Sequence, residues 1–153
     1  MIAVADPVVV GDTIYLGTMA GRVMAIDIKT GERLWTANEG AISPVWVSGG
    51  SVFLISDRNE LLRLDASDGS RVWGTKLPFF TKNRPKRQKE IFAHYGPVLA
   101  GGRLVVTSSD GQIRSFDPKS GALIGTTAVP GGATTNPVIA GRTLYVVSTK
   151  GQL

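Results

Sequence analysis

Short apolar segments bounded by turn residues recur along the whole chain. Four of them follow a Pro-Val pair, at Pro7-Val8, Pro44-Val45, Pro97-Val98 and Pro137-Val138. Each is followed by a Gly-containing turn and a second apolar segment. Apolar runs of three to five residues bounded by Gly, Pro, Asn or Asp are typical of β-strands, and no segment has a sustained helical period. The pattern therefore predicts strands throughout, with no helix longer than about two turns.

The segments form a repeat. Two of the three Pro-Val spacings are about 40 residues, the length of a four-stranded propeller blade, and the longer one contains an insertion. The third and fourth strands of a unit are joined by an Asp-x-x-x-Gly turn, at Asp27 to Gly31, Asp65 to Gly69 and Asp117 to Gly121. Four-stranded sheets repeated in this way predict an all-β fold, a β-propeller fragment of three complete blades and part of a fourth. The expected blades are 7–43, 44–96 with an insertion at 78–92, 97–136 and the partial 137–153.

The three turn aspartates have two interpretations. They could be calcium ligands, or each could cap its own turn by accepting backbone N–H groups. They fall in equivalent turns of three different blades and are therefore far apart. Turn capping is the prediction.

Composition narrows the classes of protein. The chain has 153 residues, is 42% hydrophobic and contains 19 Gly, without a collagen period. No apolar stretch approaches 18 residues, so no membrane-spanning segment is expected. The segment from Met1 to Pro7 has neither a basic region nor an apolar core and does not read as a signal peptide. Cysteine is absent, which excludes disulfides, thiolate metal sites and cysteine nucleophiles.

The positive charge comes from one place. The chain has 17 Lys and Arg against 12 Asp and Glu, a net charge of +5. Five residues of the insertion account for the whole excess of positive charge: Lys82, Arg84, Lys86, Arg87 and Lys89. The insertion is either a solvated, mobile loop or a contact loop in which Phe79 and Phe80 anchor a partner and the basic residues attract an acidic protein or anionic lipid heads. Nucleic acid is not the expected partner, because the charge is confined to one loop.

No catalytic group stands out. His94 is the single histidine, and no Gly-x-Ser-x-Gly nucleophile elbow accompanies it. We expect it to be a packed or partly exposed structural residue. The sequence assigns no catalytic, cofactor-binding or metal-binding residue.

The spacing Ala25-x-Asp27-x-x-x-Gly31-x-x-x-Trp35 resembles the quinoprotein-type propeller repeat. In that repeat the Trp of the outer strand docks against the neighbouring blade, which implies a docking role for Trp35. The second unit keeps Asp65, Gly69 and Trp73 but not the Ala, with Leu64 directly before the Asp, and implies the same role for Trp73. The third unit has Gly125 at the Trp position, so its blade is expected to dock more loosely.

The order of blades and turns resembles the C-terminal half of the BamB-type outer-membrane assembly lipoprotein family. The stretches Tyr95 to Leu104 and Leu144 to Leu153 carry most of the likeness. The resemblance implies an eight-bladed ring in the periplasm, associated with the outer membrane, that acts as a non-catalytic scaffold without a cofactor. Its protein partner would be the periplasmic domains of a BamA-like protein.

Membrane association would come only from a lipidated N-terminus that these residues do not include, and self-association that completes a ring is a further expectation. No partner-binding residue of the family can be placed on a matching position. The alternative is a fragment of a PQQ-dependent oxidoreductase or of a sensor propeller, because such proteins share the repeat. Channel-facing carboxylates that bind calcium would favour that alternative.

Overall fold

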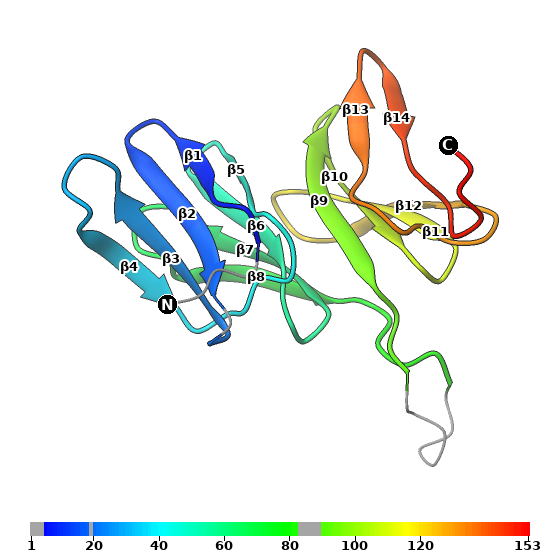
Figure 1. Ribbon diagram of the computed structural model, residues 1–153, viewed down its shortest axis with the longest axis horizontal. Helices are drawn as coiled ribbons and strands as arrows, with labels where there is room; N and C mark the ends of the chain where they lie inside the picture. The colour runs from blue at the N-terminus through cyan, green and yellow to red at the C-terminus, as the bar shows by residue number, and fades with distance from the viewer. Residues whose placement is uncertain (1–4, 19, 83–89) are drawn as a thin grey trace. The chain divides into compact units, whose positions relative to one another are not determined.

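The computed structural model describes residues 5–18, 20–82 and 90–153. Within these residues the protein is all-β, with three four-stranded antiparallel sheets and one two-stranded sheet (Figure 1). No helix is assigned to this part of the chain, and thus none that is long and apolar enough to cross a membrane. The predicted all-β fold of propeller blades is confirmed.

The chain divides into two compact units, 1–75 and 76–153, which are described separately. The first unit holds two sheets, each formed by four strands in sequence order. The first sheet contains β1 (Val8–Val10), β2 (Thr13–Thr18), β3 (Arg22–Asp27) and β4 (Arg33–Ala37). The second contains β5 (Trp46–Ser48), β6 (Ser51–Ile55), β7 (Glu60–Asp65) and β8 (Arg71–Lys76), the last residue of β8 opening the second unit.

The core of the first unit lies between its two sheets. It is made of apolar side chains from the middle strands, from β4 and from the connection between β4 and β5: Tyr15, Val23, Ala25, Trp35, Ala37, Ala41, Val45, Val52, Leu54, Leu62 and Leu64. Strands β6 and β7 read as nearly continuous apolar runs because they are buried on both faces. Burial of these side chains is the main force that holds one blade against the next.

Trp35 on β4 reaches from the first sheet to the second. Its side chain is 7% exposed, and its indole Nε1 donates a hydrogen bond of 2.8 Å to the carbonyl oxygen of Ala66. Its ring centroid lies 6.0 Å from that of Tyr15. The ring also lies against Gly69, where an added Cβ would be 2.4 Å from the indole Cε3. Gly69 therefore leaves the space that the indole fills.

The Asp-x-x-x-Gly turns have the predicted capping geometry. Asp27 Oδ1 accepts the backbone N–H groups of Lys29 and Thr30, both at 2.8 Å. Asp65 and Asp117 accept N–H groups of their own turns in the same way. These bonds lower the pKa of Asp27 because they stabilise its ionised form, and the bond from the N–H of Thr30 has the largest effect. Turn capping is confirmed for all three aspartates.

The second unit holds the third four-stranded sheet and the two-stranded one. The former contains β9 (His94–Ala100), β10 (Arg103–Ser108), β11 (Gln112–Phe116) and β12 (Leu123–Ala128), and the latter β13 (Val138–Ala140) and β14 (Thr143–Tyr145). Leu104, Val106 and Phe116 are buried in the third sheet. Hydrogen bonds tie the segment before β13 to this sheet. Gly96 N donates to Asn136 Oδ1 at 2.9 Å, Thr107 Oγ1 donates to the Thr135 carbonyl at 3.3 Å, and Ala133 N donates to the Ser108 carbonyl at 2.9 Å.

Candidate contact site on the insertion

The insertion begins as a paired stem. The N–H of Phe92 donates to the carbonyl of Phe79 at 2.9 Å, and the N–H of Thr81 donates to that of Glu90 at 3.1 Å. Phe80 and Ile91 form an antiparallel bridge between these two bonds. In Figure 1 this stem (green) runs on from the start of β9 and points away from the sheet that contains β9. The described ends of the insertion are therefore an arm with backbone pairing.

The stem presents apolar side chains to water. Phe79 is 37% exposed, Phe80 is 38% exposed and Ile91 is 54% exposed. The two phenyl rings meet edge to face, with centroids 4.7 Å apart and planes at 71°. Adjacent exposed aromatic groups of this kind are typical anchors of protein interfaces, because they bury a large area and lose little side-chain entropy.

In the sequence, the five basic residues fall between the two halves of the paired stem. Lys82 is exposed, directly beyond the paired stem. Arg84, Lys86, Arg87 and Lys89 lie outside the described residues. Their predicted role in binding an acidic partner, like that of Phe79 and Phe80, stays a prediction.

The root of the arm is fixed by His94, whose importance the sequence did not reveal. The side chain of His94 is 2% exposed. Its Nε2 lies 2.7 Å from the carbonyl oxygen of Pro78, and its Nδ1 lies 2.6 Å from Oγ of Ser108. Ser108 is fully buried, so this Ser–His pair is closed to a substrate and acts as an internal hydrogen bond. The bonds span 14 and 16 residues, and no local motif could have indicated them.

Trp73 belongs to the first unit. It is partly buried, and its ring centroid lies 6.2 Å from that of Phe53 on β6. Its docking role stays a prediction. Among residues 5–18, 20–82 and 90–153, no three His, Cys, Asp or Glu side chains come together in a group that could hold a metal ion.

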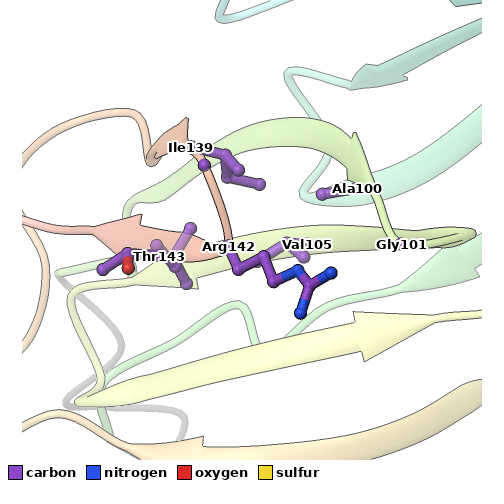
Figure 2. A pocket seen from close by; sticks show the side chains of 8 residues that line it. Ala100, Gly101, Val105, Ile139, Arg142 and Thr143 are labelled. Atoms are coloured by element: carbon purple, nitrogen blue, oxygen red, sulfur yellow. The ribbon is translucent and has the colours of Figure 1, made fainter.

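A pocket of about 460 Å³ lies in the second unit between the β9–β10 and β13–β14 turns (Figure 2). Ala100, Val105, Ile139 and Leu144 give it an apolar wall, and Arg142 places a guanidinium group beside it. Arg142 and most of the other lining residues of the turns are exposed. The pocket is a surface hollow without a buried polar group to orient a ligand.

Comparison with known proteins points to one family. The family model described as "Outer membrane protein assembly factor BamB" matches residues 3–75 and 82–153. A protein of that name from Legionella pneumophila (strain Paris) is 25% identical over 97% of this chain and 36% of its own length. The chain thus spans about a third of the curated relatives that it matches.

Solved structures agree on the fold. The crystal structure of BamB from Moraxella catarrhalis matches with a TM-score of 0.76 and 20% identity, over 94% of this chain and 46% of that one. The quinohemoprotein alcohol dehydrogenase from Comamonas testosteroni matches with a TM-score of 0.61 and 21% identity, over 82% of this chain and 21% of that one. At these identities the dehydrogenase shows only the shared fold. The family model matches both units of the chain, and this match shows that the chain belongs to the outer membrane protein assembly factor BamB family.

Proposed function

We propose that this chain is part of a non-catalytic binding scaffold for the assembly of outer-membrane proteins, and that it works in the periplasm at the outer membrane. The match of the BamB family model to nearly the whole chain is the observation that carries the proposal. Its partner is a protein of the same assembly machinery, of the BamA type.

The insertion is the proposed contact element. Its stem exposes Phe79, Phe80 and Ile91 together, and five basic residues follow between positions 82 and 89. Apolar anchors beside concentrated positive charge suit an acidic protein surface: the charges speed encounter and the aromatic rings supply binding free energy. The rest of the chain has equal numbers of basic and acidic residues, so this attraction is local.

The test replaces all five basic residues of the insertion with Gln and measures binding to the periplasmic domains of a BamA-type partner. We expect the variant to bind about tenfold or more weakly than the unmodified chain at low salt. The difference should be smaller at high salt, because screening weakens the charge attraction that only the unmodified chain has. The thermal midpoint should stay nearly unchanged, since exposed charges contribute little to stability.

A matched control removes five exposed positive charges elsewhere: Arg33, Arg58, Arg103, Arg142 and Lys150, each to Gln. It should keep most of the binding. Equal losses in the two variants would contradict the insertion as contact element, and no binding by the unmodified chain would contradict the scaffold. Calcium-dependent binding of a quinone would instead support the oxidoreductase alternative.

A further inference from the structure

The imidazole of His94 connects three parts of the second unit. It lies on β9, accepts or donates a hydrogen bond at Ser108 on β10, and reaches the carbonyl oxygen of Pro78. Pro78 directly precedes Phe79, the first residue of the paired stem. This single buried side chain therefore joins the root of the arm to the third sheet.

The hydrogen-bond partners fix the protonation of the ring. A carbonyl oxygen only accepts, so Nε2 of His94 carries the proton that points at Pro78. In the neutral ring Nδ1 is then an acceptor, and the Ser108 hydroxyl donates to it. The same Ser108 oxygen accepts a bond of 3.1 Å from Nη1 of Arg114. Every donor thus meets an acceptor as long as His94 is neutral.

Protonation of His94 would keep the Nε2–H donor to Pro78 but place a positive charge in a site where the side chain is 2% exposed and Arg114 is close by, so the charged ring favours leaving the site for water. Nδ1 would become a donor aimed at an oxygen that already accepts from Arg114, and two cations would share one hydroxyl group. The charged groups that face the ring are Arg114 from β11 and Asp110 from the β10–β11 turn. Asp110 is already paired with Arg114, with Nη2 to Oδ2 at 2.5 Å, and offers little further compensation.

We propose that His94 is an acid-sensitive latch that holds the arm against the third sheet when its imidazole is neutral and releases the root of the arm when the imidazole is protonated. The latch acts on the root of the arm and would work in the same way whichever partner the arm contacts. Release would free Pro78 and loosen the stem that presents Phe79 and Phe80. Acid would then change how the arm is displayed, while β9 and β10 stay paired.

The direction of the pH dependence follows from the site. Burial lowers the pKa of His94 below its usual 6.5, and Arg114 adds to this effect, while the Pro78 carbonyl and Asp110 oppose it. A group with a lowered pKa in the latched state stabilises that state above its free pKa, and loses this contribution as pH falls. The latch should therefore open about tenfold more readily for each pH unit between the free and latched pKa values.

The experiment follows hydrogen exchange of the Phe92 and Thr81 amides between about pH 7 and pH 4.5, corrected for intrinsic exchange, alongside NMR titration of the His94 ring. We expect protection of these two amides to fall about tenfold per pH unit once the pH is below the free pKa of His94 and until it reaches the latched pKa. The Ala25 amide of the first unit should keep its protection and serves as the reference.

Two variants make the result decisive. His94→Gln keeps a donor for Pro78 and cannot be protonated, so its stem protection should not depend on pH. Ser108→Ala removes the hydroxyl that favours the neutral ring and so brings the pKa of His94 in the latched state closer to its free value. Its stem should therefore be less protected at neutral pH and lose less further protection as pH falls. The latch is overturned if stem protection stays constant as pH falls below the free pKa of His94, or if His94→Gln shows the same pH-dependent loss.

Discussion

One tryptophan shows how a single side chain joins two sheets of the first unit. Trp35 is buried, fills the space above Gly69 and donates to the Ala66 carbonyl. Trp35→Ala should lower the free energy of unfolding by roughly 3–5 kcal/mol, because it removes a large buried ring and leaves a cavity. Chemical denaturation with urea measures the change.

A second tryptophan provides the control. Trp46 on β5 is exposed, so Trp46→Ala should cost much less than Trp35→Ala. Trp35→Phe keeps much of the ring but loses the bond to Ala66, and should cost about 1–3 kcal/mol. Equal denaturation midpoints for Trp35→Ala and the unmodified protein would contradict the docking role.

Residues differ in how far their surroundings could be predicted. The capping of the turns by Asp27 could be predicted because the donors lie two and three residues away. The role of His94 could not, because its partners Pro78 and Ser108 reach it only after β9 and β10 have paired. Sequence patterns report local geometry well, whereas a buried polar contact depends on tertiary neighbours.

At the scale of elements, the predicted strands are present but several are longer than their apolar segments. In the fourth strand of the third blade the apolar run is only Leu123-Ile124, while β12 continues to Ala128. The added residues are polar or small, and backbone pairing with β11 holds them in the strand. The paired stem of the insertion was not predicted either, because Phe80 and Ile91 stand opposite each other without an alternating pattern around them.

The third blade has Gly125 where the other two blades have the outer-strand Trp, and substitutions at Gly125 can test how much space surrounds this position. An added Cβ at Gly125 would meet no atom within 4 Å. Gly125→Ala should therefore raise stability by about 0.5–1 kcal/mol, because the substitution lowers the entropy of the unfolded chain. Gly125→Trp should be tolerated, with a thermal midpoint no lower than that of the unmodified protein.

A strand glycine of the first blade is the matched control. At Gly17 on β2 an added Cβ would lie 2.9 Å from Cβ of Ala41. Gly17→Ala should destabilise by about 1–3 kcal/mol through overpacking. If calorimetry gave the two Ala variants the same midpoint, the difference in packing between these outer and inner strands would be disproved.

At the scale of the molecule, the repeat predicted the fold class and the resemblance predicted the family. Regular turns and apolar segments specify blades because each four-stranded sheet has to bury its faces against a neighbour. A quinohemoprotein alcohol dehydrogenase shares the fold, so the fold does not specify chemistry. The proposed contact element therefore lies outside the repeat, in the insertion whose described ends pair through Phe79, Thr81, Glu90 and Phe92.

Exposed apolar side chains on the strands of both units predict self-association. They are Val9, Val10, Leu34 and Val72 in the first unit and Leu123, Ile124 and Val138 in the second. Water solvates such surfaces poorly, and association of copies removes them from water. A protein of these 153 residues should therefore sediment at micromolar concentration as a dimer or larger species, with a mass above 16.2 kDa that falls on dilution.

The side chains of β12 allow this association to be tested at one place. Replacing Leu123 and Ile124 with Thr keeps strand propensity and makes the exposed positions polar, so dissociation should occur at a higher protein concentration. Replacing the exposed Thr126 and Thr127 with Ser changes the same strand without removing apolar surface, and should leave the sedimentation unchanged. A single 16.2 kDa species at every concentration would show that these faces stay solvated, and the apolar exposure would then need a partner of another kind.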